Sequence, residues 1–223
     1  TRYWRDWSSD VCSSDLSFSC NKISLKGTSE PESSVASIAT LRAPNEIRVM
    51  SFNILAPCWA DPVYYPASSA PYLNRVNRRQ SIISLLQSYQ NSVDIFALQE
   101  VAQVEFNYIR DALQLTHVGI QANHSPSYWS NWITPANPWE LNGNAIFVRR
   151  GLFTNITFED FPTSNSGNHS ALFTGTIRNS GGKTLRAASI HLDSDHAFNR
   201  KNEMGAILNK WLDRKSTRLN SSH

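Results

Sequence analysis

Three polar residues with catalytic potential lie in or directly after apolar stretches of the chain. Asn53 and Glu100 each follow an apolar run, and His191 lies within a third. A carboxylate suits a hard divalent cation such as Mg²⁺, which prefers oxygen ligands. An amide can donate a hydrogen bond to an anion without adding charge, and a histidine can transfer a proton near neutral pH. Taken singly, each residue also fits an ordinary structural role, so only their combination points to chemistry.

Hydrophobic periodicity predicts the elements that must position these side chains. Strands are predicted at residues 47–52, 94–99, 117–121, 144–149, 156–161, 171–178 and 185–192. Helices are predicted at residues 74–89, 104–115 and 199–212. A turn is expected at Asn142-Gly143 and a hairpin turn at residues 179–182. The early alternation of strands and helices, followed by hairpin-linked strands, predicts an α/β (α+β) fold with a mixed sheet and flanking helices.

The neighbours of these residues form motifs with a recognisable order. They are S-F-N-I-L at residues 51–55, D-I-F-A-L-Q-E-V at 94–101, G-N-A-I at 143–146 and S-I-H-L at 189–192. This series resembles the successive motifs of the endonuclease/exonuclease/phosphatase superfamily, which includes the deoxyribonuclease-like enzymes. The resemblance implies the first half of a four-layer α/β/β/α sandwich, in a chain that stops after roughly the first of its two sheets.

The resemblance also implies a metal-dependent phosphodiester hydrolase. Glu100 would bind the metal, Mg²⁺ or alternatively Mn²⁺, and Asn53 would orient Glu100 or a phosphate oxygen. His191 would contact a phosphoryl oxygen or assist proton transfer. The family's later G-D-x-N motif and its terminal S-D-H motif are not found. Residues 194–196 do read S-D-H, but they directly follow the His191 motif, too early in the chain order to be the terminal motif, and we expect them to lie in a solvated loop. We therefore expect activity in the full-length parent and an inactive fragment here.

Further similarities bear on the branch of the superfamily and its substrate. N-I-L-A at residues 53–56, followed by Tyr72-Leu73 and Arg78-Arg79, looks like the arm with the poly(A) deadenylases and nocturnin-like phosphatases. R-K-N-E at residues 200–203 resembles a shared R-x-x-Q helix and is expected to be structural. The aromatic stretch at residues 128–139 suits either base stacking or packing.

Several substrates and one non-catalytic role stay open. The leading interpretation is a phosphodiester substrate such as RNA or a nucleotide. The alternatives are a sphingomyelinase- or inositol-phosphatase-like phosphoesterase, or a non-catalytic binding module with the same fold.

The two ends of the chain, residues 1–16 and 213–223, are expected to be translations of a sequencing adapter. One codon choice for residues 213–223 gives a nucleotide string whose reverse complement, in another frame, encodes residues 6–15 and begins a codon compatible with Leu16. Unrelated protein termini have no reason to be complementary in this way. Residues 17–45, rich in Ser, Thr, Glu and Pro, are expected to be a disordered leader or linker. Residues 46–212 would then be a truncated domain of the superfamily.

Composition narrows the class of protein further. The formal net charge of +3 is too small to mark a nucleic-acid binder by itself. No apolar run is long enough to predict a membrane span. Of the three cysteines, Cys12 falls in the adapter run, and Cys20 and Cys58 are too few to predict a disulfide framework. Nothing in the sequence implies an oligomer.

Overall fold

The computed structural model describes residues 19–24, 46–60, 62–124, 142–163, 168–193 and 196–219. The strands are β1 (Ser19–Ser24), β2 (Glu46–Asn53), β3 (Ile95–Ala102), β4 (His117–Asn123), β5 (Asn142–Arg149), β6 (Phe153–Pro162), β7 (His169–Ile177) and β8 (Thr184–Ser189). The helices are α1 (Ala70–Leu73), α2 (Arg75–Tyr89), α3 (Gln103–Leu113) and α4 (Ala197–Leu219), with short 3-10 turns η1 (Pro57–Trp59), η2 (Pro62–Tyr64) and η3 (Ala67–Ser69). Every strand and helix predicted from residue 47 onward is present, with shifted ends.

The first sheet has the strand order β1-β2-β3-β5-β4. Strands β2 and β3 are parallel, whereas the other neighbouring pairs are antiparallel. The carboxyl ends of β2 and β3 therefore lie at the same edge. Strand β3 is buried along almost its whole length, which explains why its sequence is a nearly continuous apolar run rather than an alternating one.

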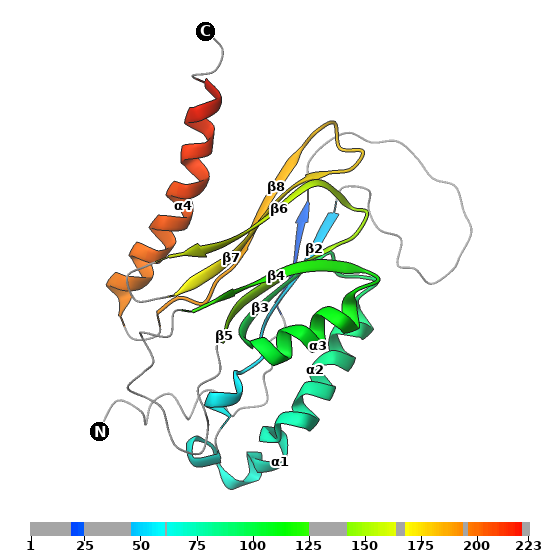
Figure 1. Ribbon diagram of the computed structural model, residues 1–223, viewed down its shortest axis with the longest axis vertical. Coiled ribbons are helices and arrows are strands. Elements are labelled where there is room, and N and C mark those ends of the chain that lie inside the picture. The colour runs from blue at the N-terminus through cyan, green and yellow to red at the C-terminus, as the bar shows by residue number, and fades with distance from the viewer. Residues whose placement is uncertain are drawn as a thin grey trace, which may run out of the picture.

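Helices α2 and α3 cover one face of this sheet (Figure 1). Asn74 caps α2 by accepting a hydrogen bond from the backbone N–H of Asn77 at 3.1 Å. The core beneath the helices includes Leu86 from α2, Ile109 from α3 and Phe96 from β3. The buried apolar residues of each helix recur at intervals of three or four, as in Ile82 and Leu86 of α2 and Ile109 and Leu113 of α3, so one side of each helix can be buried.

The other face of the first sheet packs against a second, antiparallel sheet of order β6-β7-β8. Ile95 and Ile146 from the first sheet share a core with Phe153 and Phe173 from the second. Helix α4 lies beside the second sheet, where Lys210 pairs with Glu159 at 2.6 Å (Figure 1). The predicted fold class, mixed α/β with flanking helices, is confirmed. The expectation that the chain stops after roughly the first sheet is wrong, because the hairpin-linked strands form a separate sheet.

Local differences from the sequence prediction have physical explanations. Residues 19–24, inside the predicted leader, form β1 because β2 offers a hydrogen-bonding edge that composition does not reveal. Asn142 and Gly143 belong to β5 and not to a turn. A Cβ added to Gly143 would lie 1.9 Å from the carbonyl oxygen of Ala122, so glycine is needed there because β4 passes close by. The aromatic stretch at residues 128–139 lies outside the described residues.

Helix α4 continues to Leu219, past the predicted end at residue 212. Among the helices within the described ranges, none is both long and apolar enough to cross a bilayer.

Two buried histidines are held in their neutral form. Burial lowers the pKa of His117 to about 4. Burial also lowers the pKa of His124 to about 3, and His191 and His169 nearby add to the effect. The ring Nδ1 of His124 accepts a hydrogen bond from the backbone N–H of His169 at 3.0 Å, so its own proton is on Nε2. A histidine in an unfolded chain has a pKa of about 6.5. Because the unfolded chain binds these protons more readily than the folded one, acid favours unfolding.

Shortening Phe173 to alanine should test whether the two sheets share one core. Phe173 is fully buried and its ring centroid lies 5.0 Å from that of Phe153. We expect Phe173→Ala to lower the free energy of unfolding by about 3–5 kcal/mol, measured by urea unfolding. Phe198→Ala, at an exposed position of α4, is the matched control and should change it by less than about 0.5 kcal/mol. Equal stability of the two variants would contradict a shared inter-sheet core.

Replacing His124 by asparagine should weaken the pH dependence of stability. The folded-state pKa lies below the unfolded one, so stability is fully present above pH 6.5 and is lost as pH falls toward about 3. Asparagine keeps an acceptor for the His169 N–H and removes the titration. Wild type should lose up to about 1.4 kcal/mol more than His124→Asn for each pH unit below 6.5, measured by urea unfolding at several pH values. His196→Asn, at an exposed position, is the control, and an unchanged pH slope in His124→Asn would refute the assignment.

Candidate active site

Asn53 and Glu100 lie side by side because β2 and β3 run in parallel. Asn53 is the last residue of β2 and is in register with Gln99, the neighbour of Glu100. The side-chain Nδ2 of Asn53 donates a hydrogen bond to Oε1 of Glu100 at 2.7 Å. Two residues that the sequence offered in separate motifs therefore form a single contact at one edge of the sheet.

Glu100 reaches this edge through a β-bulge. The register between β3 and β5 shifts between Leu98 and Val101, and the backbone φ of Glu100 is 57°. A left-handed conformation costs a residue with a side chain about 1–2 kcal/mol, and such residues cluster where local geometry serves function. The bulge lets Glu100 face Asn53 while Gln99 continues to face the second sheet.

Backbone N–H groups of the loop after β2 hold both side chains. The N–H of Ala56 donates to Oε2 of Glu100 at 3.0 Å, and the N–H of Leu55 donates to Oδ1 of Asn53 at 2.9 Å. Because the oxygen of Asn53 is engaged by Leu55, its nitrogen is the atom that faces Glu100. The Glu100 side chain is only 14% exposed, so the carboxylate is enclosed but still reachable.

His191 approaches the same carboxylate from the second sheet. Strand β8 ends at Ser189, earlier than the predicted residue 192, so His191 lies in the segment that follows the strand. Its Nε2 is 3.8 Å from Oε1 of Glu100. This is too long for a hydrogen bond but close enough for attraction when the imidazole is protonated. All three predicted residues are thus brought together.

Helix α4 fixes the segment that carries His191. The carboxylate of Glu203 is fully buried and accepts a hydrogen bond from the backbone N–H of Asp193 at 2.8 Å. Nη1 of Arg200 donates to the carbonyl oxygen of Asp193 at 3.0 Å. The R-x-x-E helix therefore has the structural role expected of it. Asp193 is buried and accepts from the backbone N–H of His196 at 2.7 Å, so the solvated loop expected there is wrong for Asp193.

A polar bridge between the sheets was missed by sequence reasoning. Nε2 of Gln99 donates to Oγ of Ser189 at 3.2 Å, and Oγ of Ser189 donates to the carbonyl oxygen of Leu98 at 2.8 Å. These bonds join the strand that carries Glu100 to the strand that leads to His191. The available signal was a polar side chain inside each of two apolar runs, at positions expected to face the core.

The donor set fits a hard divalent cation, the metal that the resemblance implies. In the part of the chain that the structure describes, no group of three or more His, Cys, Asp or Glu side chains is arranged to hold a metal. Zinc sites need three or four such ligands. Magnesium is held by one or two carboxylates, with water and substrate phosphate supplying other ligands, and Glu100 suits that arrangement. Asn53 Oδ1 already accepts from Leu55, so we expect Asn53 to orient Glu100.

Comparison with solved structures supports the architecture. The human nocturnin catalytic domain with bound sulfate anion matches with a TM-score of 0.57 and 21% identity, over 76% of this chain and 59% of that chain. An endonuclease/exonuclease/phosphatase family protein from Bacteroides thetaiotaomicron matches with a TM-score of 0.52 and 16% identity, over 78% of this chain and 61% of that chain. The chain thus spans about three fifths of each of these proteins (59% and 61%). At these identities the likeness shows a shared fold.

Comparison at the level of sequence gives the family. No curated protein matches the sequence significantly. The model of the Endonuclease/Exonuclease/phosphatase family, in contrast, matches residues 50–217, which include Asn53, Glu100 and the segment of His191. Since this match covers most of the sequence and the fold agrees with it, the chain belongs to the endonuclease/exonuclease/phosphatase family.

Proposed function

We propose that this chain carries the metal-binding part of a divalent-cation-dependent phosphodiester hydrolase that uses Mg²⁺ and accepts Mn²⁺. The observation that supports the proposal most is the enclosed Glu100 carboxylate, held by Asn53 Nδ2 at 2.7 Å and by the Ala56 N–H at 3.0 Å. These two donors fix the direction of the carboxylate before any cation binds. A prepositioned oxygen ligand is what a weakly held, strongly hydrated cation requires.

Each residue of the site has a distinct proposed role. Glu100 would hold the cation, which supplies Lewis-acid stabilisation of charge on a phosphoryl oxygen when it is bound. Asn53 keeps Glu100 in place. His191, 3.8 Å from the carboxylate, can donate a hydrogen bond or a proton to a phosphoryl oxygen of the substrate.

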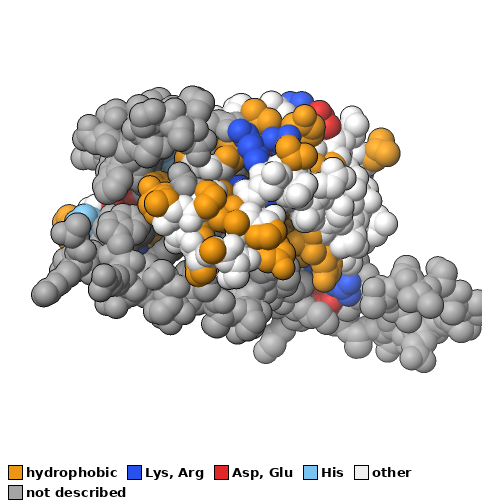
Figure 2. Space-filling view, turned by 90° about the horizontal axis from the view of Figure 1, so that it is seen from below, with side chains coloured by type: hydrophobic (Ala, Val, Ile, Leu, Met, Phe, Trp, Pro, Cys, Tyr) orange, Lys and Arg blue, Asp and Glu red, His pale blue; other side chains and the backbone are white. Residues whose placement is uncertain are grey.

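Exposed aromatic side chains in the segment between β2 and α2 favour a substrate with aromatic groups, such as RNA or a nucleotide. Tyr64 is 50% exposed and Tyr72 76% exposed, and aromatic rings on a surface can stack with bases. Figure 2, which looks at the end of the molecule where α1 lies, shows hydrophobic side chains spread over the described part of this face, with basic side chains beside them. A highly anionic inositol phosphate would be served better by a denser basic surface.

The limits of the domain are part of the proposal. We place it at residues 46–212, with the adapter-derived runs 1–16 and 213–223 outside it and residues 17–45 as a leader that contributes β1. Its partner is a phosphodiester substrate, and no oligomer is needed. Because the family's G-D-x-N and terminal S-D-H motifs are absent from the sequence, this chain is proposed to be inactive alone.

Replacing Glu100 by glutamine should remove the metal site without unfolding the chain. The amide keeps the shape of the side chain and loses the negative charge. We expect at least about tenfold weaker Mn²⁺ binding, measured by electron paramagnetic resonance of free Mn²⁺. Asp111→Asn, which neutralises an exposed carboxylate of α3, is the control and should bind Mn²⁺ as wild type does. Equal Mn²⁺ affinity in wild type and Glu100→Gln would contradict the proposed metal site.

Catalysis should require the remaining family motifs as well as Glu100. The 223-residue chain should not hydrolyse a generic phosphodiester measurably with Mg²⁺. In a longer protein that supplies those motifs, Glu100→Gln should lower kcat about 100- to 1,000-fold, measured under saturating substrate. Turnover by the 223-residue chain that Glu100→Gln abolishes would contradict its inactivity. A longer protein that binds substrate and never turns it over would point to a non-catalytic binding module.

A further inference from the structure

The loop after β2 must adopt an unfavourable backbone conformation to supply its two N–H donors. Ile54 continues the pairing with β3, donating from its N–H to the carbonyl oxygen of Gln99 at 3.1 Å. The next residue, Leu55, has a φ of 59°, a conformation that side chains disfavour. This reversal sends the Leu55 N–H back to Asn53 and carries the Ala56 N–H to Glu100. The conformation persists only if surrounding groups hold it.

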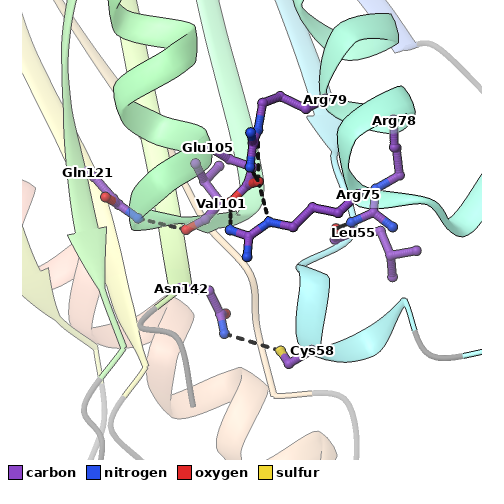
Figure 3. Close-up of polar contacts among 9 residues, drawn as sticks. All are labelled: Leu55, Cys58, Arg75, Arg78, Arg79, Val101, Glu105, Gln121 and Asn142. Atoms are coloured by element: carbon purple, nitrogen blue, oxygen red, sulfur yellow. Dashed lines mark hydrogen bonds and ion pairs between the residues drawn. The ribbon is translucent and has the colours of Figure 1, made fainter. Parts of the chain in front are cut away.

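The group that holds Leu55 comes from the helix layer. Nη2 of Arg78, on α2, donates to the carbonyl oxygen of Leu55 at 2.8 Å, as Figure 3 shows. A charged donor makes a stronger hydrogen bond than a neutral one. The bond spans from the outer helix to the loop, so it fixes the loop against the rigid body of the protein. The same peptide unit carries, at its other end, the Ala56 N–H that binds Glu100.

Arg78 differs in its contacts from the two other arginines of the same helical turn. Arg75 and Arg79 both bind the buried carboxylate of Glu105, at 2.7 Å and 2.8 Å (Figure 3). Burial opposes ionisation of Glu105, but the hydrogen bonds from these two arginines outweigh it and lower its pKa. Arg78 is half-buried, and its Nη1 is buried with no hydrogen-bond partner within the described ranges. Burying part of a guanidinium is costly, so its bond to Leu55 must matter to the fold of the loop.

We infer that Arg78 is a positioning residue of the metal site: by holding the Leu55 carbonyl it fixes the peptide whose N–H orients Glu100. The inference rests on the proposed function, since it assigns Arg78 a role in presenting the metal-binding carboxylate. Arg78 does not touch the cation or the substrate in this role. It acts through two hydrogen bonds in series, first to Leu55 and then from Ala56.

Electrostatics and positioning make opposite predictions for the loss of this arginine. The positive charge of Arg78 lies close enough to interact with Glu100. It would therefore repel a cation bound to that carboxylate. If charge alone mattered, Arg78→Met would strengthen cation binding by removing a repelling neighbour. If the loop matters, Arg78→Met frees Ala56 and Glu100 and weakens cation binding. The sign of the change in Mn²⁺ affinity therefore separates the two effects.

The experiment compares Arg78→Met, Arg78→Lys and Arg79→Met in the full 223-residue chain. Amide hydrogen exchange at Leu55 and Ala56, followed by NMR without metal, reports whether the loop is held. We expect at least about tenfold faster exchange of both amides in Arg78→Met and partial rescue in Arg78→Lys, whose ammonium can still donate to Leu55. Arg79→Met, from the same helix, should exchange at these amides as wild type does. Urea unfolding corrects for any change in global stability.

Mn²⁺ titration of the same variants then tests the link to the metal site. We expect Arg78→Met to bind Mn²⁺ about three- to tenfold more weakly than wild type, with Arg78→Lys between them. Unchanged exchange in Arg78→Met, equal acceleration in Arg79→Met, or unchanged or tighter Mn²⁺ binding would each overturn the inference. A failure of the proposed function gives a different result, because wild type and Glu100→Gln would then bind Mn²⁺ equally. Amide hydrogen exchange at Leu55 and Ala56 without metal would still show whether Arg78 holds the loop.

Discussion

The hydrogen bond from Asn53 to Glu100 depends on two backbone features that lie on neighbouring strands. Parallel pairing of β2 and β3 brings the strand ends together, and the bulge in β3 turns Glu100 toward Asn53. If β3 kept a regular register, successive side chains would alternate between its faces. Gln99 faces the second sheet, so Glu100 would then lie on the opposite face, which the helices cover. The site therefore exists because the bulge shifts the register of β3 against β5 at Glu100. Packing of β3 between two cores, one under the helices and one between the sheets, stabilises that irregularity.

Leu55 and Glu100, the two residues of the site with a left-handed backbone, each raise the energy of the folded state by about 1–2 kcal/mol. The hydrogen bonds around the carboxylate and the burial of β3 both oppose this cost. Ala56 and Ile54, on either side of Leu55, are almost fully buried, so the loop is fastened by apolar contacts as well as by polar ones. Such a loop can hold Glu100 in one orientation, which a flexible loop in water could not do.

Sequence alone predicted strands β2 to β8, helices α2 to α4 and the three residues that meet at the site, but it predicted neither β1 nor α1. Apolar runs predicted β2 and β3, and the polar residues at their ends were visible because they interrupt those runs. The left-handed conformations of Leu55 and Glu100 could not be predicted, since neither is a glycine and composition carries no sign of them. Contacts such as Gln99 with Ser189 depend on how the sheets face each other. Gly143 was misread as part of a turn because a close approach of strands and a turn both favour glycine.

The bridge from Gln99 to Ser189 also affects how the sandwich can deform. Ser189 accepts a hydrogen bond from Gln99 and donates one to the carbonyl oxygen of Leu98. Sliding the sheets by one residue, about 3.3 Å, would break both bonds at once. The bridge therefore opposes sliding of one sheet over the other at the end of the sandwich where Glu100 and His191 meet. Thermal motion should then carry these two side chains as a unit, keeping their separation steadier than the distance between more remote parts of the two sheets.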